Sequence, residues 1–389
     1  MKLGSTSLIT NKFFVRGVVY YPKDNRHNPI FNDPIADDCI SMLEQNVVLF
    51  KELGINTLYI YSVDNTKQHD KAMKLLQEAG IYVVVGVSTP SCCINRSDPY
   101  ESYNTANVSY FLKTAGVMAG YANTLGIVAT YHMAGFRDSL HAFPVLKAVI
   151  RDLKRFLLAS HKSKGTRVLP VGYSQPTAVH IKRSEFLEYL YLGDQESAID
   201  FLAASYRLKR LPNYGWAGIK SNMQMSGWNA LIDRYENFAI PAFLSEYGVN
   251  TYQPRQFLET SALYSDPMTR VFSGGCVYDF TDTPNNFGLV AMPGADKERW
   301  FQNFRGNEKK VNEVRQTDQG NLYIYHDFVN YKKALAEPTG YDPSWDIMES
   351  QAVERHNIDT TQMTWPWDPR YQMPATCIDW DSIEEVVRR

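Results

Sequence analysis

The sequence predicts an α/β fold in which eight parallel strands close into a (β/α)8 barrel, a TIM barrel, followed by a C-terminal extension. From residue 13 onward, short runs of β-branched and aromatic residues alternate with longer segments of helical period. Eight such runs can be counted, which is the strand number of this barrel. The alternative is an open doubly wound sheet, and it is disfavoured because no Gly-x-Gly-x-x-Gly motif follows the first run.

The first four predicted strands cover 13–21, 55–63, 81–87 and 125–130. A helix is expected over 39–54, because its apolar residues recur on one face and Gly54 provides a natural stop. A second helix is expected over 69–80, where Gly80 again ends the pattern. These units establish the repeating strand–helix order.

The most regular helix follows the fourth strand and covers 144–165, with basic residues near its end, where they favour the helix dipole. The remaining predicted strands are 167–174, 199–206, 239–248 and 274–280. The barrel is assigned to residues 1–338, and 339–389 is assigned to an extension packed on it. Three tryptophans of the extension stand among prolines, and they fit aromatic anchoring of the tail better than a carbohydrate-stacking platform: Trp345, Trp365 and Trp367.

Composition excludes several classes of partner. The formal charge of the 389 residues is −2 and the basic residues are scattered, so neither nucleic acid nor anionic lipid is an expected partner. The longest apolar stretches, such as 81–87, are far shorter than the ~18 residues of a membrane span. No secretion leader or lipid-anchor signal is visible at either end, so a cytoplasmic location is expected. The five cysteines lack metal-ligand spacing, so we expect reduced thiols, no metal and no cofactor.

Chemistry in such a barrel lies at the carboxyl ends of the strands. Glu246 is the strongest candidate there, because a carboxylate ending an apolar strand is costly unless it faces the barrel mouth. A structural hydrogen-bonding role is the alternative for a lone strand-end glutamate. The other strand-end positions are Tyr61, Asp64, Gly86, Tyr131, His132, Tyr206, Arg207, Tyr247, Tyr278 and Asp279.

Several segments together carry a family resemblance, among them "FFVRGVVYYP", "FKELGINTLYIYSVD", "STPSCCINRSDP", "PAFLSEYGVNTYQPRQF" and "SGGCVYDF". With these segments the chain resembles the fungal β-1,3-glucanosyltransferases of glycoside hydrolase family 72, over about residues 9 to 337. The resemblance implies a TIM barrel that cleaves β-1,3-glucan with retention and passes the glycosyl group to another glucan. It implies no cofactor.

The resemblance assigns Glu246 as the nucleophile. It also implies that His132 stands where the family has its acid/base glutamate, and Tyr131 where an asparagine would hold the sugar 2-hydroxyl. Tyr61 and Tyr278 match aromatic positions that face the sugar, and with Tyr131 and Tyr247 they are the expected substrate-binding residues.

Other positions depart from the family pattern. Gly86 stands for an aspartate, Tyr59 for an arginine, and 207–210 for a Tyr-Glu-Trp-Cys stretch. The disulfide pattern implied by the family is also lost: Cys39 keeps a family cysteine, but its partner position is Ala72, and Leu192 and Val249 replace others. The joint loss fits folding in a reducing compartment.

Three functional hypotheses follow. The first is a catalytically impaired family member that binds β-1,3-glucan. The second is an active enzyme whose acid is His132, Asp279 or Asp282. The third is a scaffold for an anionic small molecule held by Arg207, Lys209 and Arg210. The non-functional alternative for His132 is a neutral, hydrogen-bonded side chain in a pocket that has lost its activity. The non-functional alternative for 207–210 is a solvated basic loop.

Overall fold

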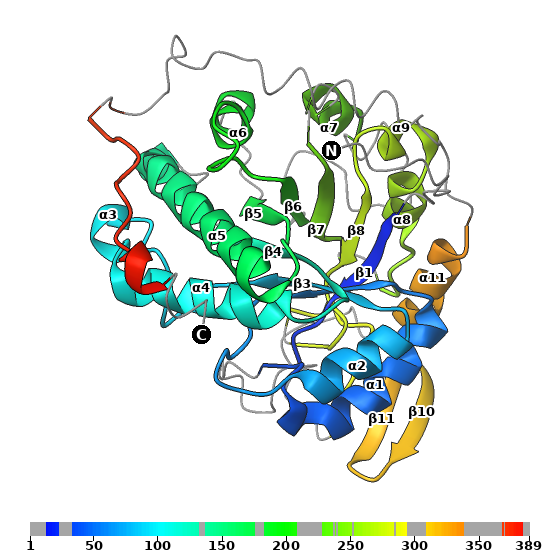
Figure 1. The fold of residues 1–389 in the computed structure, drawn as a ribbon. Helices are drawn as coiled ribbons and strands as arrows, with labels where there is room; N and C mark the ends of the chain where they lie inside the picture. Colours follow the sequence, from blue (N-terminus) through cyan, green and yellow to red (C-terminus); the bar gives the residue numbers. More distant parts are fainter. Residues whose placement is uncertain are drawn as a thin grey trace, which may run out of the picture.

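The computed structural model describes residues 13–22, 33–131, 137–175, 183–207, 228–235, 238, 240–250, 253–283, 285–293, 309–337, 368 and 370–383. Within these residues, eight parallel strands form a closed barrel in the order β1 to β8 (Figure 1). The strands are Val15–Val19 (β1), Thr57–Ile60 (β2), Tyr82–Gly86 (β3), Thr124–Tyr131 (β4), Val171–Gln175 (β5), Phe201–Arg207 (β6), Ala242–Gly248 (β7) and Gly274–Val277 (β8). The predicted barrel and its eight strands are confirmed.

Helices surround the outside of the barrel (Figure 1). They are Ile40–Leu53 (α1), Asp70–Glu78 (α2), Pro99–Ser102 (α3), Thr105–Ala119 (α4), Phe143–Lys164 (α5), Arg183–Tyr191 (α6), Trp228–Tyr235 (α7), Leu258–Leu263 (α8), Asp266–Thr269 (α9) and His326–Leu335 (α11), with short 3-10 helices at Asp37–Cys39 (η1) and Arg137–Ala142 (η2). Gly54 ends α1 with φ of 74°, and its amide donates to the carbonyls of Phe50 and Lys51. This left-handed stop is the one that the sequence predicts.

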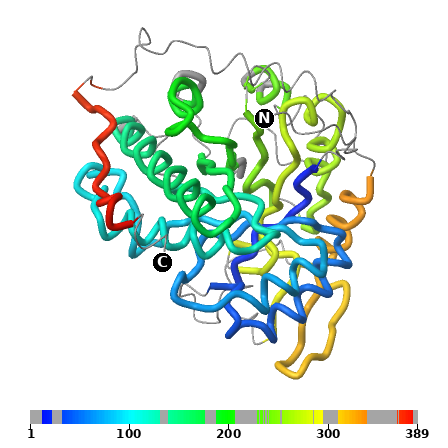
Figure 2. Tube along the Cα trace, viewed as in Figure 1, coloured from blue at the N-terminus to red at the C-terminus, as the bar shows by residue number. Residues whose placement is uncertain are grey.

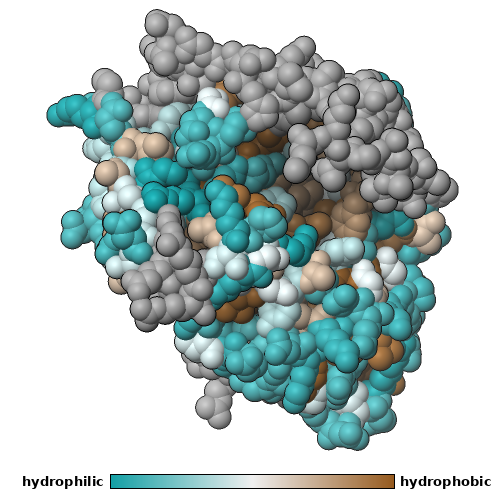
Figure 3. Space-filling model, viewed as in Figure 1, coloured by the Kyte–Doolittle hydropathy of each residue, from teal (hydrophilic) through white to brown (hydrophobic). Residues whose placement is uncertain are grey.

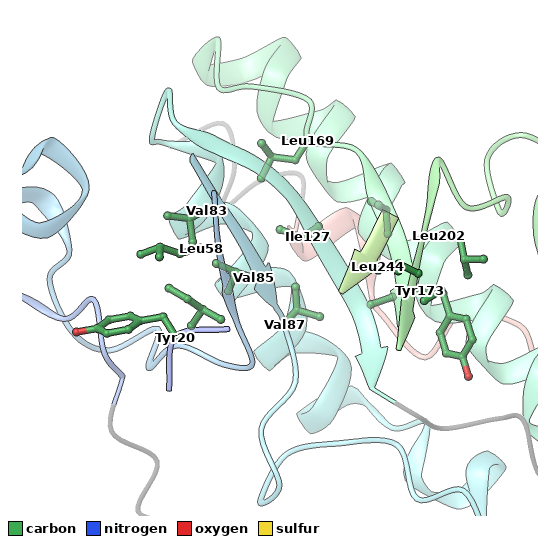
Figure 4. Packing of buried hydrophobic residues seen from close by; sticks show 14 of the residues in the cluster. Tyr20, Leu58, Val83, Val85, Val87, Ile127, Leu169, Tyr173, Leu202 and Leu244 are labelled. Atoms are coloured by element: carbon green, nitrogen blue, oxygen red, sulfur yellow. The ribbon is translucent and has the colours of Figure 1, made fainter. Parts of the chain in front are cut away.

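Hydrophobic side chains pack in two layers. Residues that alternate outward from the strands meet the helices, as Figure 4 shows for Leu58, Val83, Val85 and Ile127. Residues that alternate inward fill the barrel, where the ring of Phe243 lies 5.9 Å from Phe201 and 6.3 Å from Tyr59. The barrel interior is therefore a packed core, with its chemistry confined to the strand ends.

A small antiparallel sheet, which the sequence did not predict, follows the barrel. It has the order β10–β11–β9, from Val290–Ala291 (β9), Val311–Thr317 (β10) and Gly320–Tyr325 (β11). β9 forms soon after β8 and pairs with β11, so the hairpin covers the segment that leaves the last barrel strand. The surface over α1, α2 and this hairpin is mainly hydrophilic in the view of Figure 3.

The described part of the C-terminal extension, 370–383, runs along α3, α4 and α5 (Figure 2). Tyr100 donates to the carbonyl of Gln372 at 2.8 Å, and Arg151 donates to that of Pro374 at 2.9 Å. Arg155 lies 4.3 Å from the ring centre of Trp380. Trp345, Trp365 and Trp367 lie outside the described residues, and the boundary at 338 stays a prediction.

All five cysteines are described, and all are free thiols. Ala72 packs as a buried residue of α2, and Leu192 is buried after α6. None of the helices in the described ranges is long and apolar enough to cross a membrane.

Lys147 of α5 holds the end of α6 by its ammonium group. The side chain is buried, and its Nζ donates to the carbonyls of Tyr189 at 2.9 Å and Leu192 at 3.1 Å. A cation at these last carbonyls also matches the negative end of the helix dipole. Burial nevertheless lowers the pKa of Lys147 to about 8.

This depressed pKa predicts a distinct pH dependence of stability. Between pH 8 and the unfolded value of about 10.4, the unfolded chain binds one proton more than the native chain at this site, so the native state gains stability as pH rises. Lys147→Met should lack that gain. From pH 8 to 9.5, we expect the unfolding free energy of the unmodified chain to rise by about 1 to 2 kcal/mol relative to that of Lys147→Met.

Urea titrations of both proteins at several pH values in this range measure the difference directly. The buried tyrosines titrate identically in the two proteins and cancel. A pH-independent difference would contradict the assignment of the shift to Lys147.

Candidate active site

A bulge in β7 turns Glu246 toward the barrel interior. Ala204 pairs with Leu244, but the next pair is Ser205 with Glu246, so Ser245 is an extra residue in β7. The pairing with β8 skips the same residue, from Leu244–Gly275 to Tyr247–Val277. Because side chains alternate along a strand, one extra residue reverses the facing of everything after it. Phe243 and Glu246 therefore both face inward, although three positions separate them.

Two hydroxyl groups hold the buried carboxylate, which is 2% exposed. Tyr61, directly after β2, donates from Oη to Oε1 of Glu246, and Ser205 of β6 donates from Oγ to Oε2 at 2.9 Å. Each carboxylate oxygen thus has a donor, and the two donors come from opposite sides of the barrel. This fixes the orientation that a nucleophilic carboxylate needs.

Two further aromatic rings pack against Tyr61, the donor from the β2 side. The ring of Tyr61 lies 5.5 Å from that of Tyr21 and 5.9 Å from that of Tyr59, both edge to face. Tyr59 is fully buried. Tyr59 stands where the resemblance implies an arginine, and in the structure its ring packs against that of Tyr61.

Tyr278 lies directly after β8, the strand next to β7 in the barrel. Asn285 donates from Nδ2 to its hydroxyl at 2.9 Å, and the ring of Phe287 packs edge to face at 5.2 Å. Tyr278 is 7% exposed and belongs to the interior cluster of the barrel. The register of β7 and β8 makes it a neighbour of the Glu246 strand end.

The structure does not bring Tyr247 to this site. Its side chain faces outward, is 1% exposed, and places its hydroxyl 3.0 Å from that of Thr260 in α8. The physical reason is the bulge at Ser245, since an inward Glu246 forces its neighbour outward. Ser205, in contrast, donates to the carboxylate, although it is not among the site residues predicted from the sequence. Its position near the end of a predicted strand is the one signal that could have indicated it.

The position that the resemblance assigns to the acid/base group is not part of the described structure. Tyr131 ends β4, where its backbone pairs with Ser174, but its side chain and all of His132 lie outside the described residues. The same holds for Lys209, Arg210 and the side chain of Arg207. Gly86 is buried at the end of β3, as expected.

Both aspartates after β8, Asp279 and Asp282, are buried. Asp282 accepts from Lys309 at 3.1 Å and from the amide of Gly288 at 3.1 Å, so its carboxylate is committed to a buried ion pair. Asp279 is 2% exposed. Beneath the site, burial together with the charge of Glu246 raises the pKa of the Cys276 thiol, which is therefore an unreactive packing residue.

No group of three or more His, Cys, Asp or Glu side chains that could hold a metal ion occurs in the described ranges. The described part of the barrel mouth holds one carboxylate fixed by two hydroxyl donors, with tyrosine rings beside one of them. Retaining glycosidases use a pair of carboxyl groups, and Glu246 is a candidate for one member of such a pair.

Comparison with known proteins identifies the class further. The family model described as glucanosyltransferase, of glycoside hydrolase family 72, matches residues 4–315. The chain belongs to this family.

Among curated relatives, the 1,3-beta-glucanosyltransferase gel1 of Aspergillus fumigatus is 39% identical over 283 residues, which cover 73% of this chain. The chain spans only 58% of that relative's length. The 1,3-beta-glucanosyltransferase PGA4 of Candida albicans is 33% identical over 382 residues, covering 90% of this chain and 79% of the relative.

Solved structures of Saccharomyces cerevisiae Gas2 are similar in fold. A Gas2p mutant in complex with laminaritetraose and laminaripentaose is 27% identical, with a TM-score of 0.71 over 94% of this chain and 70% of that one. The family resemblance inferred from sequence is thereby confirmed. The cytoplasmic location stays a prediction, since none of these comparisons supports it.

Proposed function

We propose that this protein binds β-1,3-glucan in the mouth of the barrel and transfers it poorly. The observation that carries the proposal is the contrast between the two catalytic positions. Glu246 is inward, buried and held by two hydroxyl donors, whereas His132 stands where the resemblance implies the acid/base glutamate.

Retaining glycosyl transfer needs both positions. One carboxylate attacks the anomeric carbon, and a carboxylic acid ~5 to 5.5 Å away protonates the leaving oxygen and later deprotonates the acceptor. Loss of that general acid costs on the order of 10²- to 10⁴-fold in rate. Tyr131 in place of an amide removes a further contact that the resemblance assigns to the sugar 2-hydroxyl.

Glucan binding depends on aromatic side chains around the site, and the resemblance matches two of these, Tyr61 and Tyr278. Tyr61 donates to the Glu246 carboxylate, and Tyr278 belongs to the interior cluster of the barrel; phenol rings such as theirs contact the apolar faces of sugars. The similar Gas2p structure holds laminari-oligosaccharides. These points support the proposal that the protein still binds β-1,3-glucan although it lacks the glutamate that would act as general acid.

An active enzyme with a substitute acid is the alternative, and the intact hydrogen bonding of Glu246 favours it. In that case His132 or Asp279 would donate the proton. Asp282 is the weaker choice, because protonating it would break its buried ion pair with Lys309.

Incubation with reduced laminarihexaose separates the two. By mass spectrometry, we expect the unmodified protein to form at most traces of oligosaccharides that are longer or shorter than the hexasaccharide, yet to bind the hexasaccharide by calorimetry. Abundant products that appear with the unmodified protein and vanish in Glu246→Gln would establish the active alternative. Absence of any binding would overturn the proposal itself.

Matched variants locate the binding site. Tyr278→Ala should weaken binding of the hexasaccharide by about three- to tenfold, the value of one aromatic contact. Tyr247→Phe should leave binding unchanged, because its hydroxyl faces Thr260 outside the barrel. His132→Glu tests the rate: recovered transfer would show that the missing acid alone limits catalysis.

A further inference from the structure

Arg255 crosses the space between the ends of β7 and β8. It is 2% exposed, and its Nε donates to the carbonyl of Val249, just after β7, at 3.0 Å. Its Nη1 donates to the carbonyl of Tyr278 at 2.9 Å and to that of Phe287 at 2.7 Å. One planar guanidinium thus binds both the segment that follows β7 and the segment that follows β8.

The rest of the side chain is fixed as firmly. The guanidinium carbon lies 4.3 Å from the ring centre of Phe257 and 5.4 Å from that of Phe287. The backbone amide of Arg255 donates to Oδ1 of Asp327 at 3.1 Å, and Asn330 donates to its carbonyl at 2.7 Å. Both residues belong to α11, so this helix holds the backbone of Arg255 in place.

Gly248 makes room for this group. Its φ of 137° is a conformation that side chains disfavour, and a Cβ there would lie 2.1 Å from Nη2 of Arg255. Gly248 stands two residues after Glu246. The backbone beside the candidate nucleophile therefore packs directly against the guanidinium.

We propose that Arg255 is a positioning residue, which ties the end of β7 to the end of β8 and thereby sets the placement of the Tyr278 ring relative to the Glu246 carboxylate. The proposal rests on the proposed function for the role of Tyr278 as a sugar-binding wall. Arg255 acts through main-chain carbonyls, those of Val249, Tyr278 and Phe287.

The energetics support a role beyond packing. Burial lowers the pKa of Arg255, and among the described residues its Nη2 has no hydrogen-bond acceptor. A buried, incompletely paired cation is costly compared with an apolar side chain of similar size. What an apolar residue lacks is the rigid fork of donors, which holds three carbonyls of two separate segments in one plane.

Arg255→Lys tests the inference, because it keeps the charge but loses the fork. We expect the affinity for reduced laminarihexaose to fall about tenfold, since small displacements of a binding group are costly. Amide hydrogen exchange over 278–290 should rise, while exchange in α1 stays at the unmodified rate. Arg255→Gln keeps one amide donor and should likewise lower the affinity and raise the exchange over 278–290. This variant replaces Arg255→Lys in the test if the lysine variant does not fold.

Arg16→Lys is the matched control. Arg16 also donates to a main-chain carbonyl, that of Leu335 at 2.8 Å, and lies 5.4 Å from the ring of Tyr264, but it sits in β1 near the opposite end of the barrel. It should change thermal stability without changing affinity. Equal loss of affinity in both variants, or unchanged affinity in Arg255→Lys, would overturn the inference.

If the unmodified protein binds no gluco-oligosaccharide, the proposed function fails. Hydrogen exchange alone then tests whether Arg255 is a positioning residue. A rise confined to 278–290 in Arg255→Lys then still supports its positioning role. Unchanged exchange there, or a uniform rise across the chain, overturns it.

Discussion

Lys309→Met is expected to lower the free energy of unfolding by about 3 to 5 kcal/mol. The side chain of Lys309 is 1% exposed, with Nζ 3.1 Å from Oδ1 of Asp282 and 3.7 Å from Oδ2 of Asp327. It also donates to the carbonyl of Gly288. Without the ammonium group, two buried carboxylates and one carbonyl lose their shared partner, which costs far more than loss of an exposed ion pair.

Urea unfolding at pH 7, followed by circular dichroism, measures this loss. Lys310→Met is the matched control, because the neighbouring lysine is exposed and its replacement should change stability by less than about 0.5 kcal/mol. A deficit below 1 kcal/mol in Lys309→Met would show that the carboxylates find other partners.

The deficit should also depend on pH, with a sign that the structure sets. Burial already raises the pKa of Asp327 above its ordinary value, and loss of Lys309 removes a charge that lowers it. A carboxyl whose pKa is higher in the native state than in the unfolded state costs stability above that pKa and ceases to do so below it. The difference between variant and unmodified protein should therefore shrink as pH falls from 7 toward 4.

Gly172→Ala is expected to destabilise the barrel by about 1 to 3 kcal/mol through overpacking. A Cβ at Gly172 of β5 would lie 2.3 to 2.5 Å from three ring carbons of Phe201. The ring cannot retreat easily, because it packs against Phe243 inside the barrel. Thermal or urea unfolding gives the magnitude.

A double-mutant cycle with Phe201→Leu tests the cause. Phe201→Leu alone should destabilise by leaving a cavity, but in the Gly172→Ala background the smaller side chain should make room for the new methyl group. The two changes together should thus cost less than their sum. Simple additivity would place the strain of Gly172→Ala elsewhere.

Regular elements were predictable because their signals are local. The eight strands appear as apolar runs bounded by turns, and Gly54 and Gly80 mark helix ends by a conformation that glycine favours. α4 was not among the predicted helices, although its buried residues do recur at helical spacing: Val108, Phe111, Leu112, Ala115 and Met118. Small and polar residues between them weakened that pattern.

Non-local pairing was not predictable. β9, β10 and β11 form a sheet only because Val290 and Ala291 pair with Ile324 and Tyr323, more than thirty residues later. Lys309 and Arg255 are charged residues in ordinary polar segments, and nothing adjacent in the sequence marks them as buried. Their partners come from loops, strands and helices that the fold brings together.

The sequence by itself determined the barrel, the family and the candidate nucleophile, since strand periodicity and the segment around Glu246 are local and specific. Only the tertiary structure decided which way the side chains at that strand end face. The extra residue at Ser245 is visible in the pairing with β6 and β8, not in the order of residues. Because facing alternates with every position, that one residue puts Glu246 beside Tyr61 and Ser205 and turns Tyr247 away.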